Sequence, residues 1–168
     1  MRHERLARAF FNRPTLTVAK ELLGKFLVRK IDGEIVKSKI IETEAYCGTE
    51  DKASHASRGL TPRTKVMFGL AGFSYVYLIY GMYHCLNIVT ERDGYPAAVL
   101  IRGIEGYNGP GRVCRFLKID RSLNNIDITK SKDIWIENGP APDKIKKGKR
   151  IGVDYAGKWK ERLWRFRI

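Results

Sequence analysis

The sequence repeatedly places two strand-like segments on either side of a tight turn. Lys25–Ile31 and Glu34–Tyr46 flank Asp32-Gly33, a dipeptide that readily adopts the positive φ angles of a hairpin turn. Phe73–Tyr80 and Tyr83–Thr90 are separated by a glycine-containing turn in the same way. Strands joined by such short turns pair antiparallel, whereas a parallel sheet needs a helix between successive strands, and that alternation is absent. The sequence therefore predicts a mainly antiparallel sheet.

The remaining elements are predicted to be short. We expect helices at residues 3–11, 15–23 and about 111–119, the last of which opens at Gly109-Pro110-Gly111. Further strands are expected at Ala97–Gly103 and near Asp133–Glu137, Arg150–Asp154 and Leu163–Arg167. Residues 47–72 are polar and contain glycine, which indicates an ordered loop region. No repeat or linker divides the chain, so we expect residues 1–168 to form a single α+β domain, in which short helices flank a curved, mainly antiparallel sheet.

The composition suits a globular protein that stays inside the cell. A chain of 168 residues with 43% hydrophobic residues can bury a core of its own. No apolar run approaches the ~20 residues that cross a bilayer, and the N-terminus is charged where a secretory signal would be apolar. The three cysteines are widely spaced and form no CxxC pair, which argues against a disulfide framework or a zinc site and favours buried, reduced thiols.

Net charge is the strongest global signal. The chain carries 32 lysines and arginines against 18 aspartates and glutamates, which gives a formal charge of +14. Such a surface attracts polyanions through long-range steering and counterion release, whereas solubility alone would be served equally by balanced charges. Nucleic acid is therefore the expected partner, and no basic amphipathic helix with a broad apolar face points to a membrane. Composition does not distinguish a DNA enzyme from an RNA-binding or ribosomal protein.

The strand predicted at Glu34–Tyr46 ends in two carboxylates beside an aromatic ring. Side chains alternate along a strand, so Glu42, Glu44 and Tyr46 share one face. Two carboxylates there fit a general base that activates water, but they also fit the exposed polar face of an ordinary half-buried strand. Spacing alone favours the second interpretation and does not distinguish the two glutamates.

Four of the eight tyrosines fall within residues 75–83. Tyr75 and Tyr77 share a strand face, where strand propensity and packing explain much of their presence. Tyr80 lies beside Gly81 at the turn, where a turn-forming residue is usual, so packing explains it less well. An exposed aromatic at a hairpin tip of a strongly basic protein suits a wedge between base pairs, and the neighbouring rings suit a stacking platform for a base.

Two further features are weak on their own. His55 lies in a polar loop with no cysteine or histidine at metal-ligand spacing, so it fits an ordinary surface residue. The run Lys144–Arg150 holds five basic residues in seven. Runs of this kind are most often solvated loops, and they also suit contact with phosphate.

Taken together, these segments resemble the 3-methyladenine DNA glycosylases of the alkyladenine type. The likeness extends from about Phe11 to Phe166, with the matching blocks in family order. The blocks are Ile41-Glu42-Thr43-Glu44-Ala45-Tyr46, Ser54-His55-Ala56-Ser57-Arg58-Gly59, Thr61-Pro62-Arg63, Met67-Phe68, Tyr75-Val76-Tyr77, Tyr80-Gly81-Met82-Tyr83, Cys85-Leu86-Asn87, Leu100-Ile101-Arg102, Gly109-Pro110-Gly111-Arg112 and Gly152-Val153-Asp154-Tyr155-Ala156-Gly157.

The resemblance implies a role for each residue of a site. It assigns catalysis to Glu44, as the base that activates water, and to Arg102 near the reaction centre or the DNA backbone. The residues implied to bind a flipped base are Tyr46, His55, Tyr77 and, at the pocket floor, Asn87. Those implied to contact DNA are Tyr80, which would fill the gap left in the duplex, Met82, Arg58, Arg63 and Arg112.

The resemblance also implies an activity. Such an enzyme flips a damaged purine from duplex DNA and hydrolyses its N-glycosidic bond, without lyase chemistry and without a cofactor or metal. The expected partner is double-stranded DNA that contains 3-methyladenine, 7-methylguanine, hypoxanthine or etheno-adducts. We expect a monomer that works on the nucleoid in the cytoplasm if the cell is prokaryotic.

Two other functions fit parts of the sequence. A non-catalytic module that bends or surveys DNA would keep the basic surface and the aromatic wedge, but it would have no need of Glu44. An RNA-binding or ribosome-associated protein is disfavoured, because the sequence shows neither the RNP-type aromatic signature nor a KH-domain pattern anchored on a GxxG loop.

Overall fold

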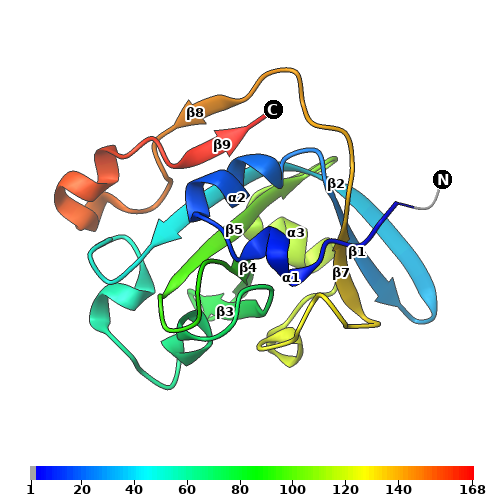
Figure 1. Ribbon diagram of the computed structural model, residues 1–168, viewed down its shortest axis with the longest axis horizontal. Helices are drawn as coiled ribbons and strands as arrows, with labels where there is room; N and C mark the ends of the chain where they lie inside the picture. The colour runs from blue at the N-terminus through cyan, green and yellow to red at the C-terminus, as the bar shows by residue number, and fades with distance from the viewer. Residues whose placement is uncertain (1–2) are drawn as a thin grey trace.

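The computed structural model describes residues 3–168, and it consists of one curled antiparallel sheet with short helices packed on it (Figure 1). The main path of the sheet runs β3-β4-β5-β2-β1-β7, and the short strands β6, β8 and β9 attach to it. The strands are β1 (Phe26–Ile31), β2 (Glu34–Cys47), β3 (Ser74–Ile79), β4 (Tyr83–Val89), β5 (Ala97–Ile104), β6 (Tyr107–Asn108), β7 (Ile134–Glu137), β8 (Lys146–Gly148) and β9 (Arg165–Arg167). The α-helices are α1 (Arg8–Phe11), α2 (Thr15–Glu21) and α3 (Pro110–Phe116), and the 3-10 helices are η1 (His55–Arg58), η2 (Thr64–Phe68), η3 (Arg121–Leu123) and η4 (Asp154–Glu161). The predicted fold class is confirmed.

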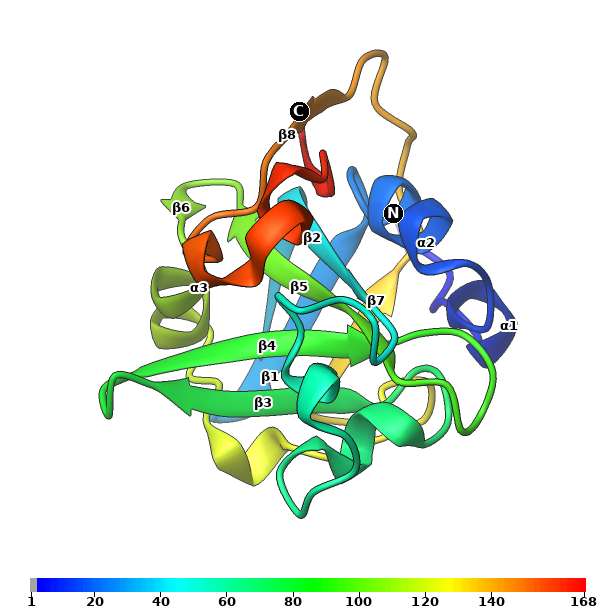
Figure 2. The ribbon, with the colours of Figure 1, turned by 90° about the vertical axis from the view of Figure 1, so that its left-hand side faces the viewer.

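Turn chemistry explains the two main hairpins. β1 and β2 join across Asp32 and Gly33, whose φ angles of 51° and 85° are the positive values that a tight hairpin turn needs. β3 and β4 join across Tyr80 and Gly81, with φ angles of 53° and 66°. The second hairpin runs to the edge of the molecule, where its tip projects (Figure 2). Both hairpins lie where the sequence predicts them.

β2 is the longest strand, and it links two parts of the sheet. Its first half pairs with β1, while its second half pairs with β5 on one edge and β9 on the other. The pairing with β5 shifts register on either side of Glu42. An irregularity of this kind bends and twists a strand and re-aims the side chains beside it, which matters below for the two glutamates of β2.

The hydrophobic core lies on the face of the sheet against which α2 and α3 pack. The helices contribute Val18, Ala19, Val113 and Cys114. Alternate strand residues meet them from the sheet, among them Ala45, Val76, Leu86, Ile88, Val99 and Ile101. Because strand side chains alternate between faces, the residues between these point to the opposite side of the sheet.

Loops and 3-10 helices cover that opposite side in part. Ala56 of η1 and Met67 of η2 pack against Tyr75 and Val89 of the sheet, and the segment that holds η4 packs on the loop that follows β2. Residues 47–72 are thus the ordered region that the sequence predicts, with η1 and η2 inside it.

The helix predicted at residues 3–11 is wrong in its first half. Only Arg8–Phe11 is helical, and the chain ahead of it is extended and runs along β7. The Leu6 backbone N–H donates to the Ile136 carbonyl at 2.8 Å. Pairing with the edge of the sheet satisfies backbone groups that a short helix would leave exposed, so the tertiary contact overrides the local preference.

The strand predicted at Arg150–Asp154 is also wrong. The strand of this region, β8, lies earlier in the chain, and residues 150–153 turn towards η4. Gly152 has a φ of 76°, which an extended strand does not accommodate, and the Arg150 side chain is buried rather than alternating with its neighbours. β6, a strand of two residues, was not predicted at all.

Three observations concern the broader sequence predictions. All three cysteines are free thiols, and Cys85 and Cys114 are buried while Cys47 is partly so. Within residues 3–168 no helix is long and apolar enough to cross a membrane. The same residues contain no cluster of three or more His, Cys, Asp or Glu side chains that could hold a metal ion.

Candidate active site

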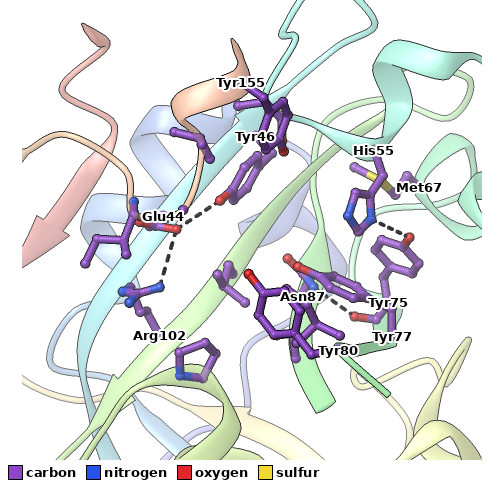
Figure 3. Close-up of a pocket in the computed structure, with 18 residues that line it drawn as sticks. Glu44, Tyr46, His55, Met67, Tyr75, Tyr77, Tyr80, Asn87, Arg102 and Tyr155 are labelled. Carbon is purple, nitrogen blue, oxygen red and sulfur yellow. Dashed lines mark hydrogen bonds and ion pairs between the residues drawn. The ribbon is translucent and has the colours of Figure 1, made fainter. Parts of the chain in front are cut away.

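A cavity of about 120 Å³ opens on the side of the sheet that faces away from α2 and α3 (Figure 3). A void of roughly 150 Å³ in another protein holds a benzene ring, so this cavity is on the scale of one planar ring. Four of its lining residues form a single row across β3, β4, β5 and β2, namely Tyr75, Asn87, Leu100 and Glu44. At ~4.8 Å per strand, the ends of this row lie about 14 Å apart. The sheet therefore holds an aromatic group and a carboxylate on opposite sides of one cavity.

Glu44 is fully buried at one end of the row. Its Oε1 accepts a hydrogen bond from the Tyr46 hydroxyl at 2.9 Å, and its Oε2 accepts one from the Ile151 backbone N–H at 2.8 Å. A guanidinium nitrogen of Arg102 lies 3.9 Å from Oε1. Both carboxylate oxygens thus have a donor, and a cation stands beside them.

Two opposing effects act on the ionisation of Glu44. Burial raises the pKa of Glu44 above its ordinary value, and this is the largest effect. The positive charge of Arg102, the Ile151 N–H, the Tyr46 hydroxyl and the more distant charge of Arg150 all lower that pKa in part. The result is a carboxyl group with a higher proton affinity than a surface glutamate, which is the property a general base requires.

Glu42 has different surroundings from Glu44. It is buried beside the cavity without lining it, and its Oε1 lies 3.3 Å from Arg102 and 3.1 Å from Arg165 of β9. The register shift at Glu42 falls between the two glutamates, which places Glu44 on the cavity and leaves Glu42 in contact with two arginines. The structure therefore distinguishes two side chains that strand periodicity leaves equivalent.

Aromatic rings form the opposite wall of the cavity. The rings of His55 and Tyr77 are 4.5 Å apart between centroids at an angle of 66°, and Tyr75 lies 5.3 Å from Tyr77. His55 Nδ1 shares a hydrogen bond of 3.0 Å with the Tyr75 hydroxyl. Tyr46 reaches the cavity from β2, on the side of Glu44. Figure 3 shows these rings around the space that Glu44 faces.

His55 is held in its neutral form. Burial lowers the pKa of His55 to about 4, and the nearby positive charges of Arg63 and Arg58 act in the same direction. An imidazole that stays neutral at physiological pH presents no charge to a ligand in the cavity. Burial also raises the pKa of Tyr77 and Tyr46, so the aromatic rings that line the cavity are neutral, and its charged groups are Glu44 and Arg102.

Asn87 lies at the middle of the cavity floor, almost completely buried on β4. Its side-chain N–H donates to the Tyr75 carbonyl at 3.2 Å, which fixes the orientation of the amide. A ring seated in the cavity would therefore meet a fixed polar group from below.

Tyr80 stands at the tip of the β3–β4 hairpin, at the mouth of the cavity. Its side chain is 82% exposed although it is a large aromatic, and its backbone has the positive φ that favours glycine or asparagine. Met82, in the same tip, is 63% exposed. Packing would favour a polar or glycine residue at an exposed turn with positive φ, so packing does not explain the apolar tip of this hairpin.

The four remaining predicted residues are distributed around the cavity. Arg58 and Arg63 line an adjoining groove, which shares His55 with the cavity, and the guanidinium of Arg63 lies 5.3 Å from the centre of the Tyr77 ring. Met82 and Arg112 line neither space, and both are exposed. The structure thus brings seven of the predicted residues to one cavity: Glu44, Arg102, Tyr46, His55, Tyr77, Asn87 and Tyr80.

Sequence reasoning missed several groups at this site. Tyr155 lies between the cavity and the groove, and its hydroxyl donates to the Ala53 carbonyl at 3.1 Å. Its position in the block Gly152–Gly157 was the only available signal. The Ile151 N–H that contacts Glu44 and the buried Arg150 had no signal, because Arg150 ends a run of lysines that reads as a solvated loop.

Comparison with known proteins identifies the family of this chain. Residues 9–108 and 106–168 match the family model described as Methylpurine-DNA glycosylase (MPG). The chain is 52% identical to a protein of Methanocella arvoryzae, over 96% of this chain and 90% of the relative. It is 51% identical to a protein of Sodalis glossinidius, over 96% and 95% of the two chains, and 49% identical to one of Legionella pneumophila strain Corby, over 98% and 94%. All three relatives bear the name "Putative 3-methyladenine DNA glycosylase".

Matches of this extent cover nearly the whole chain and include every strand of the sheet that forms the cavity. The protein therefore belongs to the methylpurine-DNA glycosylase family, the hydrolases that cleave N-glycosyl bonds of DNA in base excision repair.

Proposed function

We propose that this glycosylase flips a damaged purine from duplex DNA into the cavity and hydrolyses its bond to deoxyribose with water activated by Glu44. The observation that carries the proposal is a buried carboxyl group that faces a ring-sized, aromatic-walled cavity beside an exposed tyrosine tip. A purine inside a duplex hides its glycosidic bond, so the base must leave the stack before any side chain can reach that bond.

Glu44 performs the chemistry in this proposal. Water attacks C1′ of the sugar, its proton passes to Glu44, and the C1′–N bond breaks with its electron pair leaving on the base. The transition state has oxocarbenium character, so the negative charge of Glu44 also stabilises the positive charge that develops on the sugar. Both tasks need the ionised form, which Arg102 and the Ile151 N–H favour.

The aromatic wall recognises the base. Tyr46, His55 and Tyr77 stack on it, and Asn87 contacts its edge from the floor. A purine alkylated at a ring nitrogen is cationic, and each tyrosine face attracts such a cation by ~0.5–2 kcal/mol, depending on desolvation. Because His55 stays neutral, it does not repel that cation. The proposed substrates are 3-methyladenine, 7-methylguanine, hypoxanthine and etheno-adducts.

The hairpin tip and the basic surface hold the DNA. Tyr80 fills the space that the flipped nucleotide leaves, and Met82 contacts the neighbouring bases. Arg58 and Arg63, which line the adjoining groove, and the exposed Arg112 contact phosphates of the DNA. The enzyme acts as a monomer on double-stranded DNA, in the compartment that holds the chromosome, which in a prokaryote is the cytoplasm.

The enzyme is monofunctional in this proposal, because the nucleophile is water. A lyase forms a Schiff base between an amine and the sugar before it cuts the strand, whereas hydrolysis leaves an intact strand with an abasic site. Incubation with a duplex that carries one hypoxanthine should therefore give strand breaks only after hot alkali. Breaks without alkali would contradict the monofunctional assignment.

The decisive experiment compares Glu44→Gln with its matched control, Glu42→Gln, in single-turnover excision. Glutamine keeps the size and hydrogen bonding of the side chain but cannot accept the proton. Glu44→Gln should lose ~10²–10⁴-fold in rate, while binding to a non-cleavable lesion analogue survives or tightens because one negative charge has left the site. Glu42→Gln should be much milder. An active Glu44→Gln enzyme, or a Glu42→Gln enzyme that binds but does not cut, would overturn the assignment.

A further inference from the structure

A buried ion pair lies directly behind the wall of the cavity. Arg150 and Asp51 form two parallel contacts, at 2.6 Å and 2.9 Å, and both side chains are completely buried. Neither residue lines the cavity. Asp51 is fixed in turn by the backbone N–H groups of Cys47 and Ala53, both at 3.1 Å.

Arg150 also joins three separate parts of the chain. Its guanidinium donates to the Ala45 carbonyl at 2.9 Å and to the Trp159 carbonyl at 3.2 Å. It lies between two rings, 4.8 Å from the centre of Tyr46 and 4.9 Å from that of Trp164. One side chain thus ties β2, the loop after β2 and the segment around η4 together.

Stability alone does not explain such a pair. Removing two charges from water is costly, and buried ion pairs in other proteins can often be replaced by apolar side chains without loss of stability. Its position suggests what else it does. Ala45 stands between Glu44 and Tyr46 in the chain, and Ile151, whose N–H contacts Glu44, directly follows Arg150.

We propose that Arg150, locked by Asp51, is a positioning residue that holds the Ile151 N–H on Glu44 and the Tyr46 ring against the cavity. Arg150 touches no reacting atom, so it acts only through these two neighbours. The inference rests on the proposed role of Glu44 as the base, but the contact between Ile151 and Glu44 is measurable whether or not Glu44 is the base.

The expected effect is on the ionisation of Glu44. The groups around its carboxyl are Arg102 and Leu100 of β5, Tyr46 of β2, Cys85 of β4, Tyr77 of β3, and Ile151 and Arg150 of the segment before η4. The hydrogen bond from the Ile151 N–H lowers the pKa of Glu44, against the effect of burial. Loosening Arg150 should therefore raise that pKa further, and a larger fraction of Glu44 would be protonated at a given pH.

The test is a ¹³C NMR titration of the Glu44 carboxyl in the wild type and in Arg150→Lys. Lysine keeps the charge but loses the two-point contact with Asp51 and the stacking between rings. The midpoint of the Glu44 titration should rise by about half a pH unit or more. At one fixed pH below that midpoint, the single-turnover excision rate of the variant should be about threefold lower than that of the wild type. The matched control is Arg8→Lys, which alters a partly buried contact of 2.5 Å with Asp127 outside the cavity and should leave the midpoint unchanged.

Each outcome decides the proposal. A Glu44 midpoint that stays at the wild-type value in folded Arg150→Lys would show a purely structural pair and overturn the inference. If Arg150→Lys does not fold, the double variant Asp51→Leu, Arg150→Met removes both charges, and the same criterion applies to its Glu44 titration. An active Glu44→Gln enzyme would defeat the proposed function instead, and it would leave the titration result intact.

Discussion

Replacement of Tyr80 by asparagine tests whether the hairpin tip is built for DNA or for packing. Tyr80 has a φ of 53°, a conformation that costs a non-glycine residue about 1–2 kcal/mol and that asparagine tolerates better. The side chain is 82% exposed, so its remaining burial contributes at most about 1 kcal/mol at ~25 cal/mol per Å². The two effects give a variant that is as stable as the wild type or more stable by up to about 1 kcal/mol.

The assay measures stability and excision on the same variant. The melting temperature of Tyr80→Asn should stay constant or rise by up to about 4 °C, as ~1 kcal/mol shifts a chain of this length by ~2–4 °C. Excision of a well-paired lesion should fall by roughly 5- to 150-fold, the equivalent of ~1–3 kcal/mol of lost stacking, while a lesion opposite an abasic gap should lose much less. Asp32→Asn, at the equivalent turn of the β1–β2 hairpin, is the control and should not change excision.

A packing role for Tyr80 predicts the reverse pattern. Truncation of a ring that supports the fold costs several kcal/mol, so the melting temperature would fall by ten degrees or more. Excision would then decline equally on both substrates. Either observation would refute the interpretation of Tyr80 as a wedge.

Three further predictions concern charge and selectivity. If Arg58, Arg63 and Arg112 contact phosphates, the logarithm of the affinity for undamaged duplex should fall with the logarithm of the salt concentration at a slope of ~−2.7 or steeper. An affinity that does not change with salt would contradict the inference that the +14 charge of the protein binds DNA phosphates. Asn87→Ser should raise excision of guanine-type bases relative to hypoxanthine, because the buried amide crowds their exocyclic amine; an unchanged ratio in competition assays would place this selection elsewhere. Since burial raises the pKa of Glu44, excision of a neutral base should fall as pH drops through a midpoint above that of an ordinary glutamate. The pKa of His55, about 4, should add no further transition between pH 5 and 8 in that profile.

Local sequence signals predicted the parts of the fold that depend on local chemistry. The Asp32-Gly33 turn and the alternation of β3 and β4 fix two hairpins without any tertiary information, and both are confirmed. The helix at residues 3–11 failed because the edge of β7 competes for the same backbone groups, and that edge is formed by residues more than a hundred positions away. The periodicity of a sequence indicates which local structure a segment prefers, but it does not indicate whether a distant strand edge competes for the same backbone groups.

The positions of the site residues on the strands could be predicted from the sequence, but the long-range contacts that orient them could not. Five of the residues that the resemblance names lie on four adjacent strands and reach one cavity, so a correct strand assignment already places them on one face: Glu44, Tyr46, Tyr77, Asn87 and Arg102. His55 of η1 and Tyr80 of the hairpin turn reach the same cavity from outside the strands. The register shift at Glu42 and the buried pair of Arg150 and Asp51 were not predictable, since both depend on long-range pairing. Those two features determine which glutamate faces the cavity and what holds its hydrogen-bond donor.

The strained turn at Tyr80 and the rigidly paired strand that carries Glu44 suit two different steps of the proposed reaction. Entry of a purine requires an element that enters the duplex, and the exposed, strained turn at Tyr80 lies on a hairpin at the end of the main sheet path, where β4 pairs with β5 and β3 is the last strand. The chemistry requires a carboxylate held to a fraction of an ångström, and Glu44 sits on β2, which is paired on both edges at that residue. Burial there would favour the protonated form of Glu44, so the donors and the guanidinium around it are needed to keep the base ionised. A glutamate on the hairpin would be ionised without help but poorly oriented, whereas one on β2 is oriented by the sheet and depends on Arg102 and Ile151 for its charge.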